Sequence, residues 1–168
     1  MSWKDSGDFD KGTCRVTSTV SVFGIEDARL AEVRRIREAV FCHEQGVPPE
    51  LEWDGQDATA THFLLLRAGR PVATARTRPY GPQTWKIERV AVLKPERRTG
   101  AGREIMAAVL SFLGERPEPV RAYLHAQTDV ADFYAGLGFV SQGDIFTEAG
   151  IPHVAMTLAD LAIAPRRR

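Results

Sequence analysis

Residues 90–102 read Val-Ala-Val-Leu-Lys-Pro-Glu-Arg-Arg-Thr-Gly-Ala-Gly, and a run of helix-forming residues follows them. The apolar start predicts a strand that ends before Pro95, and apolar residues at helical spacing resume at Ile105. A short loop that leads into a helix N-terminus directs free backbone N–H groups and the positive end of the helix dipole at one place. The stretch therefore predicts an anion site suited to a phosphate or a pyrophosphate.

The rest of the chain predicts a mixed α/β (α+β) fold around this loop. A glycine turn at 68–70 separates two short apolar runs and indicates a hairpin, whereas the helix between 93 and 120 suits a parallel crossover. We expect a mostly antiparallel central sheet flanked by helices. The expected strands are 14–23, 62–67, 72–78, 85–93, 120–126, 139–146 and 153–158, and the expected helices are 26–43, 102–115 and 129–137. Asp129 is expected to cap the last helix.

Composition sets further limits. The chain has 168 residues, with 43% hydrophobic and 26% charged residues and a formal net charge of zero. This balance is typical of one globular domain, expected at 14–160, and it indicates no nucleic-acid partner. No apolar run approaches the length of a membrane span, so no membrane partner is expected.

The two ends and the cysteines complete these expectations. Residues 1–13 are polar and indicate a disordered leader rather than a secretory signal, and 161–168 form a basic tail in which Arg166–Arg168 is expected to be frayed. Cys14 and Cys42 show no metal-ligand spacing, so no metal site is expected. Free thiols suit a reducing cytosol, and a cytoplasmic location is expected.

Two motifs resemble a known family. The pattern Arg97-x-x-Gly100-x-Gly102 after the Val-Ala-Val strand is similar to the acetyl-CoA signature of the GNAT (N-acetyltransferase) superfamily. Residues 132–139, Asp-Phe-Tyr-Ala-Gly-Leu-Gly-Phe, resemble a second element of that family. Residues 40–48, 51–54 and 150–154 resemble one uncharacterised subgroup, for which no substrate is implied. The resemblance spans roughly residues 14–160.

The resemblance implies an acetyl-CoA-dependent N-acyltransferase with two splayed central strands. The acetyl group would move from acetyl-CoA to a primary amine of a small molecule or peptide by direct attack, and a homodimer is possible in this family. A non-catalytic acyl-CoA-binding regulatory module is the alternative, while a Walker-type nucleotide site lacks its lysine and hydroxyl residue. The cofactor-binding residues implied are Val90, Ala91, Val92, Arg97, Arg98, Thr99, Gly100, Ala101, Gly102, Arg103, Gln127 and Phe133.

The catalytic roles implied fall on three residues. The backbone amide of Val90 would hold the thioester oxygen if its strand splays from the next one, because a fixed N–H stabilises a developing oxyanion. Tyr134 would protonate the departing CoA thiolate, although a tyrosine in an amphipathic helix can equally be a core residue. Glu88 lies two residues before Val90 and would act as base, or else would form an ion pair with Arg76 or Arg89.

The acceptor side is less defined by the sequence. Tentative substrate residues are Glu44, Trp53, His62, Arg76 and His153. The histidines are base candidates because imidazole titrates near neutral pH, but hydrogen-bonded structural histidines are common. The acids of 44–57 indicate either a cationic acceptor or an ordinary solvated loop. Gln127 could instead cap a helix, and Cys42 could carry an acyl group, although burial on an apolar helix face is the simpler interpretation.

Overall fold

The computed structural model describes residues 17–159 and Leu161. The predicted leader, Cys14 and the Arg166–Arg168 tail lie outside the described residues. Leu161 packs into the main apolar core, so the core includes the first residue of the predicted tail. None of the described helices is long and apolar enough to cross a membrane.

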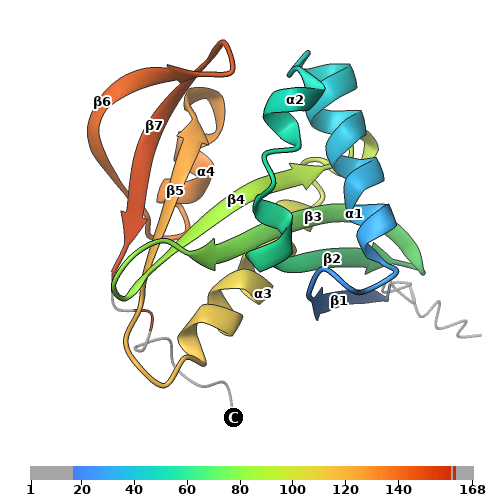
Figure 1. Cartoon of the computed structure of the whole chain (residues 1–168), viewed down its shortest axis with the longest axis horizontal. Coiled ribbons are helices and arrows are strands. Elements are labelled where there is room, and N and C mark those ends of the chain that lie inside the picture. The colour runs from blue at the N-terminus through green and yellow to red at the C-terminus, as the bar shows by residue number, and fades with distance from the viewer. Residues whose placement is uncertain (1–16, 160, 162–168) are drawn as a thin grey trace, which may run out of the picture.

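One seven-stranded sheet organises the described chain (Figure 1), in the order β1-β2-β3-β4-β5-β7-β6. The neighbours pair antiparallel except β4 and β5, which are parallel. This confirms the predicted mixed, mostly antiparallel sheet. The strands are β1 (Ser18–Phe23), β2 (Thr61–Arg67), β3 (Arg70–Pro79), β4 (Thr84–Val92), β5 (Arg121–Gln127), β6 (Val140–Glu148) and β7 (Ile151–Leu158).

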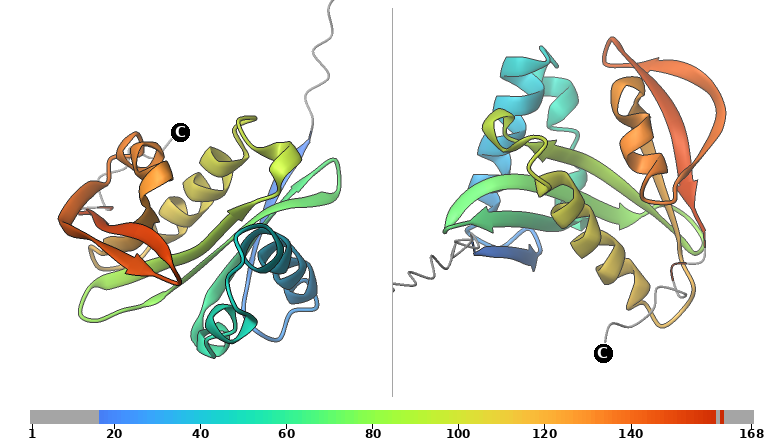
Figure 2. Two further views of the ribbon diagram at one scale, coloured as in Figure 1. Left: turned by 90° about the horizontal axis from the view of Figure 1, so that it is seen from above. Right: turned by 180° about the vertical axis from the view of Figure 1, so that it is seen from behind.

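Helices cover both faces of the sheet (Figure 2). On one face lie α1 (Leu30–Arg37), its π-helical continuation η1 (Glu38–Glu44) and the short α2 (Pro49–Glu52), while α3 (Ala101–Gly114) and α4 (Ala131–Ala135) lie on the other. Short 3₁₀ turns occupy η2 (Gln56–Thr59), η3 (Lys94–Glu96) and η4 (Thr128–Val130). The apolar stripe predicted for the first helix is buried at Leu30, Val33, Ile36 and Val40, as its 3.6-residue spacing requires.

Two helix starts differ from the sequence prediction. The first helix begins at Leu30 rather than at 26, because the Asp27 carboxylate accepts the backbone N–H and the guanidinium of Arg29 and so favours a turn there. The last helix begins at Ala131 with no side-chain cap, so the capping role predicted for Asp129 is wrong. The chain leaves this helix through Gly138, whose φ of 98° is readily adopted only by glycine.

The feature that shapes the centre of the sheet is the divergence of β4 from β5. Their paired residues are Thr84–Arg121, Trp85–Ala122 and Lys86–Tyr123, and the pairing stops there although both strands continue. The register between β3 and β4 jumps from Arg76–Glu88 to Thr74–Ala91, which inserts one extra residue into β4. Such a bulge bends and twists a strand. Arg89, within the bulge, has a φ of 54°. Figure 1 shows the ribbons of β4 and β5 diverging from one another.

Candidate functional site

The predicted anion loop lies at the far end of the divergence. After β4, the chain makes the turn η3, passes through Arg98 and Gly100 with φ values of 62° and 92°, and enters α3 at Ala101. The first intrahelical bond runs from the Glu104 N–H to the Gly100 carbonyl, so the amides of residues 101–103 precede the helical ladder. The loop therefore has the geometry that the sequence predicts for binding a phosphate group.

Arg67, at the end of β2, holds this loop in place and was missed by the sequence analysis. Its guanidinium donates to the Glu96 carboxylate at 3.1 Å, to the Thr99 carbonyl at 3.1 Å and to Glu104. A planar peptide directs its N–H opposite to its carbonyl. Since the Thr99 carbonyl faces Arg67, the Gly100 N–H points away from Arg67.

Arg97 is engaged within the protein. Its Nε donates to the Val92 carbonyl at 3.0 Å, and its guanidinium forms a two-pronged ion pair with Glu44, with one N–O distance of 2.8 Å. The same contact lowers the pKa of Glu44 through its hydrogen bond to Arg97. Two residues predicted for different tasks, cofactor and substrate binding, thus join the end of η1 to the loop. Arg98 and Arg103 are exposed beside them.

The second motif packs directly on the loop helix. A Cβ at Gly102 would lie 3.3 Å from the Phe133 ring, so glycine permits close contact between α3 and α4. Phe133 meets Tyr134 edge-on, with ring centroids 5.0 Å apart. Tyr134 is 8% exposed, and burial raises its pKa.

The hydroxyl of Tyr134 makes no hydrogen bond with any described residue. Within the same residues, the fully buried side-chain polar atoms without a hydrogen-bond partner are His62 Nδ1, Arg76 Nε and Arg89 Nε. The Tyr134 oxygen is not among them. A phenol that makes no hydrogen bond with the described residues is free to donate to a ligand that reaches it.

Val90 lies where the strands part. Glu88 and Ala91 of β4 pair with β3, but Val90 between them does not. Val90 is also unpaired with β5, because the pairing of β4 with β5 ends at Lys86, four residues before Val90. Gln127, at the end of β5, is joined across the divergence to Gln45, which follows η1. The two amides bond reciprocally, at 2.9 and 3.3 Å. Gln127 occupies the N-cap position of η4, as the alternative expected, but its side chain makes no capping hydrogen bond there.

Glu88 forms the ion pair with Arg76 that was the alternative to a catalytic role, and Arg78 and Lys86 also pair with it. Arg76 lies at 2.8 Å, Arg78 at 3.0 Å and Lys86 at 3.2 Å from its carboxylate. Although burial opposes the charge, the contacts with Arg78, Arg76 and Lys86 lower the pKa of Glu88 to about 2. A carboxylate with so low a pKa is a weak proton acceptor at neutral pH.

The acidic segment is neither a solvated loop nor a free cation site. Glu52 and Asp57 turn inward to the fully buried Arg37, with Asp57 at 2.7 Å, and Asp57 also pairs with Arg76 at 2.9 Å. Arg89 reaches Glu52 at 2.7 Å and donates to the carbonyls of Leu51 and Glu52, which fixes α2 on the bulge of β4. Glu44, Glu52, Asp54 and Asp57 are thus ion-paired with arginines of the protein, which argues against their forming a free site for a cationic acceptor.

Two of the predicted substrate residues, Arg76 and His62, are buried within this network. Arg76 and His62 are 0% exposed, which argues against direct contact with an acceptor. Arg76 binds Asp54, Asp57 and Glu88. His62 Nε2 lies 3.1 Å from the Asp57 carbonyl, and burial lowers the pKa of its imidazole.

Trp53, His153 and Cys42 complete the predicted set. Trp53 is 38% exposed, and the Arg37 guanidinium lies 4.9 Å from its ring centroid. His153 Nδ1 donates to the Ile151 carbonyl at 2.7 Å. Cys42 is a free thiol whose pKa is raised mainly by burial, which disfavours the nucleophilic thiolate.

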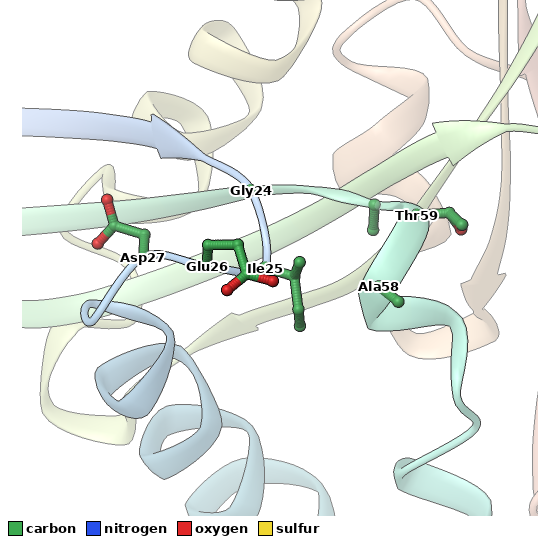
Figure 3. Close-up of a pocket in the computed structure, with 7 residues that line it drawn as sticks. Gly24, Ile25, Glu26, Asp27, Ala58 and Thr59 are labelled. Carbon is green, nitrogen blue, oxygen red and sulfur yellow. The ribbon is translucent and has the colours of Figure 1, made fainter.

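An open hollow lies elsewhere on the surface. Figure 3 shows it between the turn after β1 and the junction of η2 with β2, lined by Gly24, Ile25, Glu26, Asp27, Ala58, Thr59 and Ala60. None of the predicted site residues lines it. The features that match the two motifs are at the divergence of β4 and β5 instead.

Comparison with known proteins agrees with this geometry. The model of the acetyltransferase (GNAT) domain matches residues 25–159. The chain belongs to the GNAT acetyltransferase family. The uncharacterized protein YyaT of Bacillus subtilis is 38% identical to this chain over 135 residues, which cover 78% of this chain and 89% of YyaT. The uncharacterized N-acetyltransferase YjcF of the same organism is 34% identical over 140 residues, covering 81% and 96%.

Solved structures share the fold. Escherichia coli ElaA superimposes with a TM-score of 0.76 at 26% identity, covering 84% of this chain and 99% of ElaA. An acyl-CoA N-acyltransferase from Pseudomonas aeruginosa gives 0.76 at 25% identity, covering 85% and 100%. The predicted membership of the superfamily and the predicted fold class are thereby confirmed.

Proposed function

We propose that this protein transfers an acetyl group from acetyl-CoA to a primary amine of a small molecule or peptide. The observation that carries the proposal is the loop of residues 97–103. The amides of 101–103 precede the helical ladder of α3, and the loop follows a strand that parts from β5 after Lys86. The amides would hold the diphosphate, and the parting strands would admit the pantetheine arm with its thioester.

Three groups would then act on the thioester. The Val90 amide would stabilise the oxyanion that forms when the amine attacks the carbonyl carbon. The Tyr134 hydroxyl would donate a proton to the CoA sulfur as the carbon–sulfur bond breaks, and its raised pKa keeps it protonated at neutral pH. Gln127 and Phe133 would flank the arm.

A thiol-release assay tests the proposal. Purified protein with acetyl-CoA and a panel of primary amines (2-phenylethylamine, spermidine, L-lysine and a peptide with a free N-terminus) should release CoA in the presence of at least one amine. Tyr134→Phe should bind acetyl-CoA normally and lose about 10²–10⁴-fold in kcat. Acetyl-CoA binding with no turnover of any amine would instead favour the non-catalytic acyl-CoA-binding module.

A further inference from the structure

A chain of hydrogen-bonded side chains joins β5 to β6, and neither motif includes it. The Tyr123 hydroxyl lies 2.8 Å from His125 Nε2, and His125 Nδ1 lies 3.1 Å from the Glu148 carboxylate. Glu148 also faces His153 Nε2 at 4.0 Å. Aromatic contacts hold the imidazole, since Phe146 meets the His125 ring edge-on at 4.8 Å.

The position of His125 connects this chain of contacts to the proposed reaction. Along β5 the residues Ala122, Leu124 and Ala126 are buried, and Tyr123, His125 and Gln127 alternate with them onto the opposite face, away from α3 and α4. Tyr123 is in the last residue pair that joins β5 to β4. His125 is therefore the first residue on that face beyond the point where the strands part.

Its counterpart on β4 is Glu88, two residues beyond Lys86. Three cations hold Glu88 ionised. Glu88 is thus committed to ion pairs, which leaves on this face the imidazole of His125, a side-chain type that commonly serves as a general base. The side chain of His125 is 20% exposed, so a ligand can reach it.

The partners of His125 define its tautomer. An ionised carboxylate only accepts hydrogen bonds, so Nδ1 carries the hydrogen that is donated to Glu148. Nε2 then keeps its lone pair and accepts the Tyr123 O–H. Burial raises the pKa of Tyr123, and Tyr80 and Glu148 add to this, so the phenol remains a donor. The N–H of an acceptor amine can take the place of this O–H at Nε2.

We propose, on the basis of the transferase function above, that His125 is the general base of the reaction and that Glu148 is its positioning residue. An N–H bond of the acceptor ammonium breaks and its proton moves to Nε2. The freed nitrogen lone pair attacks the thioester carbonyl, and the carbon–sulfur pair of electrons leaves with sulfur. A second N–H proton leaves as the amide forms and balances the proton that sulfur takes up, and the imidazolium returns its proton to solvent.

Other charged groups around the imidazole are few in the described structure. Tyr123 and Glu148 contact it, His153 faces it across Glu148, and Lys86 lies beyond Tyr123, over the Tyr80 ring that stacks on Tyr123. Of these, Glu148 is the group whose charge stabilises the imidazolium directly. Its removal should lower the basicity of His125.

The experiment compares His125→Gln, Glu148→Gln and a control, His43→Gln, across pH in the thiol-release assay with the amine panel. His43 suits as a control because it is also a histidine near a carboxylate, 3.9 Å from Glu38, but it is 75% exposed on η1. His125→Gln should lose about 10²–10⁴-fold in kcat with little change in KM for acetyl-CoA. Glu148→Gln should lose less and should move the acidic limb of the kcat/KM profile to lower pH, and the control should match wild type.

A second readout needs no acceptor. An NMR titration of the imidazole resonances should give a lower pKa for His125 in Glu148→Gln than in wild type. If His125→Gln turned over at the wild-type rate with an unchanged acidic limb, the assignment of His125 as the base would be overturned, while the proposed transferase function would stand. An unchanged His125 titration in Glu148→Gln would overturn the positioning role. Absence of turnover by wild type with every amine would count against the proposed function itself.

Discussion

The buried ion network predicts a large loss of stability when Arg37 is replaced by methionine. Arg37 is 0% exposed and binds both Glu52 and Asp57. Removing one partner of a buried ion pair typically costs about 3–5 kcal/mol, because the other charge is left without compensation. Here Glu52 keeps Arg89 at 2.7 Å and Asp57 keeps Arg76 at 2.9 Å. The expected loss therefore lies at the lower end, about 3 kcal/mol.

Urea unfolding followed by circular dichroism measures this free energy. A loss of about 3 kcal/mol corresponds to a fall in Tm of roughly 6–12 °C for a domain of this size. Arg35→Met is the matched control on the same helix, since Arg35 pairs with Glu32 at the surface and is 75% exposed. An exposed pair contributes only about 0–1 kcal/mol. If Arg37→Met destabilised the protein no more than the control does, the inference that the network fixes the acidic segment would be refuted.

Two further predictions concern the loop and the acid stability. Arg67→Met should weaken acetyl-CoA binding about tenfold or more in calorimetry, because the loop loses its charge-assisted hydrogen bonds to Glu96 and Glu104, and equal affinity would contradict this. Glu88 has a folded pKa of about 2 against an ordinary 4.5, so the stability it contributes is present above pH 4.5 and is lost as pH falls toward 2. As the pH is lowered from 4.5 toward 2, the free energy of unfolding of Glu88→Gln, measured by urea titration, should therefore fall less than that of wild type. If the two proteins lost the same free energy over this pH range, the assigned pKa shift would be refuted.

The strand, loop and helix between 84 and 114 were predictable because local signals agree there. Apolar residues end at Pro95, glycines follow, and a helical stripe resumes, so β4 and α3 begin and end within a residue or two of expectation. The predicted start of the first helix was less accurate, because the Asp27 side chain favours a turn over a helix there.

The charge network and the bulge were not predictable, because they depend on residues that meet only in the folded chain. Arg37 reads as one more polar helix residue, and its partners lie 15 and 20 positions away beyond two turns. Nothing local marks Arg89 as left-handed. Its side chain binds the carbonyls of Leu51 and Glu52, which lie more than 35 positions away in the sequence and reach Arg89 only in the folded chain. His125 escaped notice for the same reason, since Glu148 reaches it from another strand.

The most direct test of the central claim, that the loop amides hold the diphosphate of acetyl-CoA, is a calorimetric comparison of acetyl-CoA with S-acetylpantetheine on wild type and Gly100→Val. S-acetylpantetheine lacks the diphosphate together with the 3′-phosphoadenosine, and the Gly100→Val arm separates the contribution of the loop from that of the adenosine. Valine is strained at the φ of 92° that Gly100 adopts, so the loop should change while the rest of the site is kept. The account predicts that wild type binds acetyl-CoA about 100-fold more tightly than S-acetylpantetheine, as two charge-assisted hydrogen bonds would give, and that Gly100→Val removes most of this difference. Equal affinities of wild type for the two ligands, or an undiminished preference in Gly100→Val, would contradict it.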